Sequence, residues 1–296
     1  MLLPVSVPVR IPISVPPSHS PRGDHWPSPC KVVRDLYNQR LKLIGAHPAH
    51  LSEIRELEQL DGLGKVIVYA RGGNRSQWQA LGFRSEGTIP GFFSDAAEAT
   101  IWASYPRPER GQEKGKHLHD TCLLLALSKP AIYRTSLPQG YSSQLLGPEE
   151  AAEAARLLRA EFPVYRTPLS NDHLLGAILW GTSLYRGVRA PDGALVAVAS
   201  AELDGTRRNA KVTDCATRPD QRGRGLMAHL ISQLESDLRR DYEITDLYTL
   251  ARAQEVGMNC VFRKLGYSFQ GRLINNCRMP FGWESMHIWC KCSDDR

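Results

Sequence analysis

The chain has no apolar run approaching the roughly 20 residues that a membrane-spanning helix needs, and no block of five or more like charges. A nucleic-acid-binding tail is therefore not indicated, although the formal net charge is +6. The seven cysteines form no Cys-x-x-Cys pair, which argues against a zinc ribbon or a disulfide framework. We expect a cytoplasmic protein without a metal centre that binds neither membrane nor nucleic acid.

Two well-known phosphate loops are also missing, because there is no Gly-Lys-Ser/Thr and no third glycine of the dinucleotide fingerprint. What is present is residues 213–227, TDCATRPDQRGRGLM, followed by apolar residues at three- and four-residue steps that predict a helix over 224–241. A glycine-bearing turn that opens a helix offers unpaired N–H groups and the positive end of the helix dipole. Gly223 and Gly225 would let a diphosphate approach this backbone closely.

Length and composition indicate two packed units. The chain has 296 residues, of which 42% are hydrophobic, and this is enough for more than one core. Residues 1–29 contain eight prolines, which interrupt any signal-peptide core and predict a disordered tail. We divide the rest into an N-terminal α/β domain at 30–130 and a second domain at 131–296.

The second domain carries the clearer pattern of secondary structure. Helices are predicted over 148–160 and 171–180, and strands over 184–188, 195–203, 209–217, 244–251, 271–277 and 285–290. The order strand, helix, strand across 209–251 implies a parallel pair joined by a right-handed crossover. In the first domain we predict helix from Lys31 to about Leu60, a strand over Lys65–Ala70 and a strand over Thr121–Leu127.

One internal similarity links the two domains. Residues 81–89 (LGFRSEGTI) align with residues 265–273 (LGYSFQGRL), and both follow a short helix and end in a strand. We interpret 30–130 as a reduced copy of the second fold. It lacks an equivalent of Arg-Gly-Arg-Gly, which predicts a structural or substrate-shaping role.

The loop at 222–227 (RGRGLM) resembles the Arg/Gln-x-x-Gly-x-Gly/Ala pyrophosphate loop of the GCN5-related N-acetyltransferases (GNAT), with Met227 at the last position. Residues 257–267 (GMNCVFRKLGY) resemble the second motif of that family. The resemblance implies an α/β GNAT fold with a mixed sheet and splayed central parallel strands, preceded by a smaller degenerate GNAT-like domain. It also implies acetyl-CoA as co-substrate, a small-molecule amine as partner, and a monomer or homodimer. The implied cofactor-binding residues are Cys215, Ala216, Thr217, Arg222, Gly223, Arg224, Gly225, Leu226, Met227, Asn259 and Phe262.

Acetyl transfer needs a neutral amine, whereas a free alkylammonium has a pKa of ~10.4. A base, or water leading to one, must therefore take a proton, and our candidates are Asp214 and Glu284. For each, recognition of a substrate ammonium or a plain ion pair is the alternative. In many family members a tyrosine of the second motif protonates the departing thiolate, but that position is Phe262 here. Tyr248, Tyr267 or water would then substitute, or the thiolate leaves unassisted.

A narrower resemblance, to the β-lysine N-acetyltransferases, covers residues 209–217, 222–227, 271–277 and 284–289, together with 81–93 of the first domain. Lys211 stands where an acidic residue is expected in that family. The resemblance implies acetylation of the ε-amine of β-lysine, giving an osmolyte. The rival interpretations are another small polyamine or lysine-like amine as substrate, and a non-catalytic acyl-CoA-binding regulator. The substrate-binding residues are expected to be Asn275, Asn276, Arg278 and Glu284, with a backbone-bonding turn as the alternative for the asparagine pair.

Overall fold

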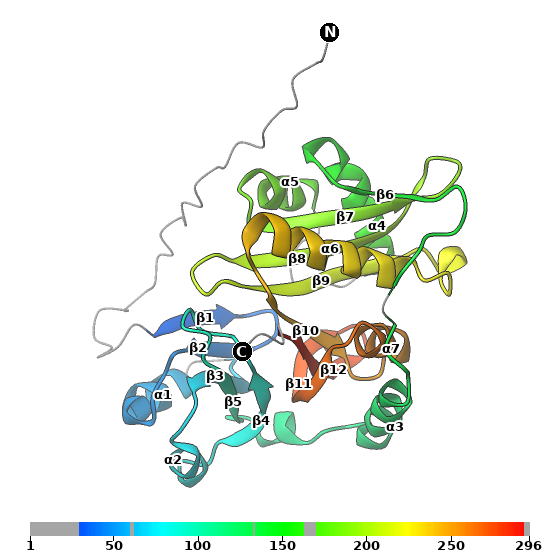
Figure 1. The fold of residues 1–296 in the computed structure, drawn as a ribbon. Coiled ribbons are helices and arrows are strands. Elements are labelled where there is room, and N and C mark those ends of the chain that lie inside the picture. Colours follow the sequence, from blue (N-terminus) through cyan, green and yellow to red (C-terminus); the bar gives the residue numbers. More distant parts are fainter. Residues whose placement is uncertain (1–29, 60–61, 133, 163–169, 293–296) are drawn as a thin grey trace.

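The computed structural model describes residues 30–59, 62–132, 134–162 and 170–292. The tail predicted at 1–29 lies outside the described residues. The described strands form one twelve-stranded sheet in the order β1-β2-β3-β5-β4-β11-β12-β10-β9-β8-β7-β6. Figure 1 shows that this sheet runs through both halves of the chain, with helices on its faces.

The elements of the two halves have the following bounds. The first half consists of β1 (Lys31–Asp35), β2 (Arg40–Ile44), η1 (Pro48–His50), α1 (Leu51–Glu58), β3 (Lys65–Arg71), α2 (Arg75–Ala80), β4 (Arg84–Ile89), β5 (Ala99–Ser104), η2 (Pro108–Gly111) and α3 (Lys116–Leu127). The second half consists of β6 (Ser142–Leu145), η3 (Pro148–Glu150), α4 (Ala151–Glu161), α5 (Asn171–Leu179), β7 (Ser183–Arg189), β8 (Leu195–Asp204), β9 (Asn209–Thr217), η4 (Pro219–Gln221), α6 (Leu226–Tyr242), β10 (Asp246–Arg252), α7 (Val256–Lys264), β11 (Ser268–Met279) and β12 (Gly282–Lys291).

Two predictions in the first half were wrong. The first part of the segment predicted to be helical before Leu60 is the antiparallel hairpin β1–β2, and helix is found only from η1 through α1. The hairpin turns at Gln39, which has a φ of 47°, and β-branched Val32 and Val33 favour the strand. The strand predicted at Thr121–Leu127 lies in α3, because its leucine and alanine residues favour helix over strand.

The second half follows the prediction closely. The expected hairpin is β8–β9, and α6 occupies the predicted helix. Strands β9 and β10 pair in parallel only from Asn209 and Asp246 to Val212 and Thr249. Beyond this point a bulge at Asp214, which has a φ of 47°, displaces β9 relative to β8. The mixed sheet and the splayed central strands of a GNAT fold are therefore confirmed.

The two halves share one pattern of strand pairing. In the first half an antiparallel pair (β1–β2) is followed by a parallel pair (β2–β3) and then by β3, β5 and β4 in antiparallel order. The second half repeats this pattern as β8–β9, β9–β10 and then β10, β12 and β11. This agreement supports the interpretation of 30–130 as a reduced copy, which stays a prediction.

The last strands of the two patterns, β4 and β11, meet at Gly87 and Gly271, which are equivalent positions of the internal similarity. Their φ angles are 142° and 148°. A Cβ on Gly271 would lie 2.3 Å from the carbonyl oxygen of Glu86, and one on Gly87 would lie 2.5 Å from that of Gln270. The halves therefore join through a contact that only glycine permits.

We predict that Gly271→Ala lowers the free energy of unfolding by about 2–4 kcal/mol, because its methyl group collides with backbone that cannot rotate away. Gly282→Ala is the matched control, since Gly282 has a φ of 128° but open space around its Cβ position. Urea denaturation measures both variants. A Gly271→Ala protein as stable as the control would show that the strands can separate without cost.

Candidate active site

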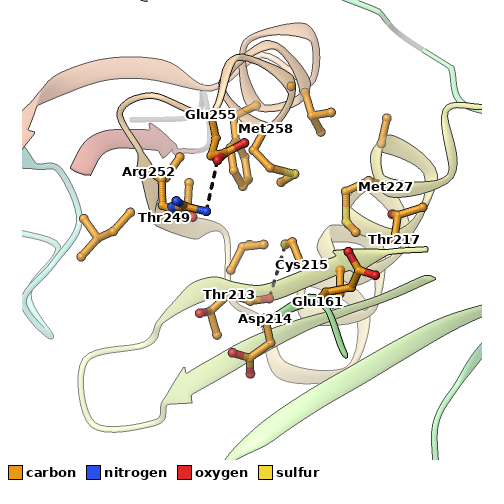
Figure 2. Close-up of a pocket in the computed structure, with 18 of the residues that line it drawn as sticks. Glu161, Thr213, Asp214, Cys215, Thr217, Met227, Thr249, Arg252, Glu255 and Met258 are labelled. Carbon is orange, nitrogen blue, oxygen red and sulfur yellow. Dashed lines mark hydrogen bonds and ion pairs between the residues drawn. The ribbon is translucent and has the colours of Figure 1, made fainter. Parts of the chain in front are cut away.

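A cavity of about 860 Å³ lies between the diverging strands β9 and β10. Figure 2 shows Thr213, Cys215 and Thr217 on one wall and Thr249, Arg252 and Met258 facing them. One end is formed by residues 221–228, the loop and first turn of α6. The opposite end is formed by Arg40, Met286 and residues 277–279 of β11. The cavity therefore joins the predicted phosphate loop to a wall that includes both halves of the chain.

The loop end is built as an anion site. Gly223 and Gly225 have φ angles of 77° and 76°, and Gly225 is the N-cap of α6 without a side-chain cap. The first hydrogen bond of the helix runs from His229 N to Gly225 O. The N–H groups of Leu226 and Met227 thus have no acceptor within the helix, and the helix dipole adds positive charge there. This arrangement fits a diphosphate.

The predicted cofactor-binding residues fall into two groups. The following line the cavity: Cys215, Ala216, Thr217, Arg222, Gly223, Arg224, Gly225, Leu226, Met227 and Phe262. Arg222 Nε donates to Thr217 O at 3.1 Å, and its Nη2 pairs with Glu161 at 2.5 Å. The arginine therefore braces the loop against β9 and α4.

Asn259 was predicted as a cofactor ligand, but the structure gives it another role. Its Nδ2 donates to the carbonyls of Arg252 and Glu255 at 3.0 and 2.8 Å. Its Oδ1 accepts from His287 Nδ1 at 2.9 Å and from Trp289 Nε1 at 2.8 Å. All its hydrogen-bonding capacity is used, so this fully buried side chain ties the end of β10 to β12.

Cys215 lies on the cavity wall as a neutral thiol. Its Sγ donates to Thr213 O at 3.4 Å, and burial raises the pKa of this thiol far above its ordinary value. A cysteine nucleophile needs a thiolate. The environment of Cys215 therefore opposes its use as a nucleophile.

Asp214 occupies the β9 bulge, and Figure 2 shows its side chain on the opposite side of the strand from Cys215. Its carboxylate accepts from Ser200 Oγ at 2.9 Å and from the Tyr185 hydroxyl at 3.2 Å. The residue is among those that line the cavity. Two hydroxyl groups thus hold the Asp214 carboxylate on the far side of β9 from Cys215, and its role as the base stays a prediction.

Glu284 is not placed for the roles predicted for it. Arg252 Nε and Nη2 donate to its two carboxylate oxygens at 2.7 and 2.8 Å, and Gln254 Nε2 donates at 2.9 Å. Its side chain is 10% exposed and does not line the cavity. The plain ion pair, which was the alternative interpretation, is what the structure contains. Arg252 lines the cavity and was missed, because its partner is 32 residues away in the sequence.

The tyrosines predicted as proton donors are also out of reach. Tyr248 packs against Phe92, with 6.0 Å between ring centroids, and burial raises its pKa. Tyr267 is fully buried against Phe262. Neither lines the cavity, because both side chains point into apolar packing. Of the predicted possibilities, protonation of the thiolate by water and its unassisted departure therefore remain.

The predicted substrate-binding residues are divided by a bulge in β11. Asn275 Nδ2 donates to the carbonyls of Arg110 and Gln112 at 2.9 and 2.8 Å, so it faces the first half. Asn276 is fully buried and does not line the cavity. Arg278 is exposed and lines it. Of the four residues predicted, Arg278 alone is thus placed to meet a ligand.

Two kinds of feature are absent from the residues that the structure describes. Among them, no group of three or more histidine, cysteine, aspartate or glutamate side chains could hold a metal ion. Likewise, no helix in these ranges has the length and apolar character to cross a membrane.

Comparison with known proteins agrees with this geometry. The family model described as "Acetyltransferase (GNAT) family" matches residues 152–267. The chain is 32% identical over 273 residues to a β-lysine N(6)-acetyltransferase of Methanosarcina mazei, covering 85% of this chain and 99% of the relative. It is 26% identical over 260 residues to the N-acetyltransferase YodP of Bacillus subtilis, covering 87% and 94%. A ribosomal-protein-S5-alanine acetyltransferase structure from Vibrio fischeri aligns with a TM-score of 0.47 and 13% identity, over 55% of this chain and 98% of that one.

The chain belongs to the GNAT family of acetyltransferases. It resembles the β-lysine acetyltransferases in particular, and the match of 85% of the chain extends into the first half. It is an N-acetyltransferase that uses acetyl-CoA as co-substrate and acts on amines. The unpaired amides at the start of α6 are the group that fits the diphosphate of this co-substrate.

We predict that Gly225→Glu raises the KM for acetyl-CoA by about tenfold or more, because a carboxylate then faces the diphosphate at the helix N-terminus. Gly225→Ala is the control for backbone strain, since it disturbs the same φ without adding charge. Steady-state kinetics with varied acetyl-CoA measure both. An unchanged KM in the glutamate variant would mean that the phosphates bind elsewhere.

His287 gives a prediction about pH. Its Nε2 accepts from Arg272 Nε at 3.1 Å while its Nδ1 donates to Asn259, so the folded protein needs the neutral ring. Burial, and then the charge of Arg272, lower the pKa of His287 to about 3. The unfolded chain binds this proton below its ordinary pKa of about 6.5, so stability is lost as the pH falls from 6.5 towards 3.

We therefore expect wild-type protein to lose about 1.5 kcal/mol more than His287→Gln between pH 6.5 and pH 5, because glutamine does not titrate. Urea unfolding at both pH values measures the difference. Equal losses in the two proteins would mean that His287 is not held neutral.

Proposed function

We propose that this enzyme transfers the acetyl group of acetyl-CoA to the ε-amine of β-lysine and so forms the osmolyte Nε-acetyl-β-lysine. The observation that carries the proposal is the 32% identity with the Methanosarcina relative over 99% of that protein's length. The match includes the first half, which contributes Arg40 to the cavity wall.

The charges along the cavity support an acceptor that has a carboxylate as well as amines. Arg278 presents an exposed guanidinium at the end opposite the loop, and such a group binds carboxylates with two hydrogen bonds. Lys211 also lines the cavity and pairs with Glu202 at 3.1 Å. A polycation such as spermidine would meet like charge here. A zwitterionic diamine suits the site better.

Acetyl-CoA supplies the acetyl group as a thioester, whose C–S bond breaks as the new N–C bond forms, leaving coenzyme A as the thiolate. An ammonium cannot attack the thioester, so a base first takes one of its protons, and Asp214, reached through water, is our proposed base. The second proton, which the nitrogen loses as the amide forms, passes to the thiolate or to water. Ser200 and Tyr185 donate to the Asp214 carboxylate and so fix its orientation. The carboxylates of Glu161 and Glu255 also line the cavity, where they pair with Arg222 at 2.5 Å and with Arg252 at 3.1 Å.

The alternative acceptor is another small polyamine or lysine-like amine. Lys211 in the cavity wall disfavours a substrate with a third positive charge, so a lysine-like amine is the better of these alternatives. A non-catalytic acyl-CoA-binding regulator is the alternative from a different class. Phe262, which lines the cavity where a tyrosine donor is common in the family, is the feature that favours it.

The test is release of free thiol from acetyl-CoA with β-lysine, lysine, ornithine, spermidine and a lysine-containing peptide. We expect the highest kcat/KM with β-lysine. Turnover of the peptide without turnover of β-lysine would reject the proposal. Absence of thiol release with every amine would favour the regulator.

We also predict that Arg278→Gln raises the KM for β-lysine by about tenfold and leaves the KM for acetyl-CoA close to the wild-type value, because only the acceptor loses a charged partner. Arg239→Gln is the matched control, since Arg239 is exposed on α6 and does not line the cavity. An unchanged KM for β-lysine in the Arg278 variant would remove this residue from the binding site.

A further inference from the structure

The bulge in β11 breaks the ladder beside the acceptor end of the cavity. Leu273 pairs with Met286 and Cys277 with Glu284, so three residues (274–276) stand opposite Ser285 alone. A bulge of this kind leaves backbone groups without their ladder partners. Asn275, at its centre, has a φ of 43°.

Three buried cations from the first half bind the three carbonyls of this bulge. Lys65 Nζ donates to Ile274 O at 2.7 Å, and Arg40 Nη1 donates to Asn276 O at 2.8 Å. Arg110 donates to Asn275 O through Nε at 3.2 Å and through Nη2 at 3.0 Å. We call Lys65, Arg110 and Arg40 the carbonyl clamp. Their exposures are 0%, 2% and 1%, so all three cations are removed from water.

Stability alone is a poor explanation of the clamp. Lys65 pairs with Glu86 at 2.6 Å and Arg40 with Asp35 at 2.9 Å, while Arg110 stacks 3.3 Å from the centre of the Trp283 ring. Desolvation lowers the pKa of Lys65 to about 8 and that of Arg110 to about 10. Burying such charges costs so much free energy that well-packed apolar residues commonly stabilise a core as well or better. Their geometric effect on the bulge is the better explanation.

That effect reaches the active site directly. Residues 277–279 follow the bulge and line the acceptor end of the cavity together with Arg40. The N–H of Arg278 donates to Asn38 Oδ1 at 2.8 Å, which adds another contact from the first half. The direction in which Arg278 leaves the bulge is thus set by groups more than 160 positions earlier in the chain.

We propose that the carbonyl clamp consists of positioning residues for acceptor binding, and that the first half is in this way a working part of the active site. Lys65 and Arg110 act through the backbone of β11, since neither lines the cavity. The inference rests on the proposed function only for the choice of β-lysine as the test amine.

The test uses two variants. Arg110→Lys keeps the positive charge but loses the paired donors to Asn275 O. The double variant Lys65→Met with Glu86→Gln removes the ion pair as a whole, so that no buried carboxylate is left without its partner. We expect each to raise the KM for β-lysine by about tenfold, with the KM for acetyl-CoA close to wild type, because the loop end is not disturbed. Hydrogen exchange of the peptide covering 273–280 should become faster in both.

The control is Ile54→Ala, which removes a fully buried side chain from the core of the first half without touching the clamp. It should lower the melting temperature while both KM values stay unchanged, which separates positioning from general loss of stability. Arg110→Lys is mild enough to serve where the double variant does not fold. Folded clamp variants with a wild-type KM for the acceptor, or with both KM values raised equally, would overturn the inference.

Failure of the proposed function can be distinguished from failure of the carbonyl clamp. If the wild-type enzyme does not acetylate β-lysine, the KM for the acceptor and the KM for acetyl-CoA are measured with the amine of the panel that it does acetylate. The substrate assignment is then rejected, while the clamp is still tested by the acceptor KM of the variants.

Discussion

The separation of β9 from β10 after four paired positions is the constraint on which the rest of the structure depends. Strand β9 stays paired with β8, and β10 stays paired with β12. The sheet therefore opens only between β9 and β10. The bulge at Asp214 turns β9 away from β10. The freed backbone of β9 and the first turn of α6 then face one cavity. An extended acyl carrier with a diphosphate at one end fits such a slot, because it can replace the missing strand partner and also bind the unpaired amides.

The first half has the same pairing pattern but keeps its parallel strands together. Strands β2 and β3 pair along the whole of β2, from Arg40 with Lys65 to Ile44 with Tyr69, and the helices α1 and α2 cover an apolar core on one face. The separation that opens the cavity between β9 and β10 is thus not repeated between β2 and β3. What this half adds is a set of contacts to β11, through the approach of Gly87 to Gly271 and through the side chains that reach the β11 bulge. The same order of strands thus opens a cavity in the second half and keeps the parallel pair together in the first.

Sequence reasoning succeeded where the determinants are local and failed where a bulge intervenes. The loop and α6 could be predicted because glycine positions and apolar periodicity act within a few residues. In β11 the extra residues of the bulge change which face each side chain occupies. Asn275 and Asn276 could thus be placed near the cavity but not given a direction. The clamp could not be found, because a lysine or arginine in a strand pattern indicates a solvent-facing position until its distant carbonyl partners are known.

The structure also narrows what the enzyme can contribute to the chemistry. Glu284 is bound by Arg252, Tyr248 and Tyr267 pack against Phe92 and Phe262, and burial raises the pKa of the Cys215 thiol. Of the carboxylates that line the cavity, Glu161 and Glu255 are paired with Arg222 and Arg252, and that of Asp214 is held by two hydroxyl groups. Where acid–base groups are few, more of the rate must come from holding the amine close to the thioester in the right orientation. That requirement explains why the acceptor wall is fixed so firmly: a shift of about 1 Å in its position would cost more rate here than in a site rich in catalytic groups.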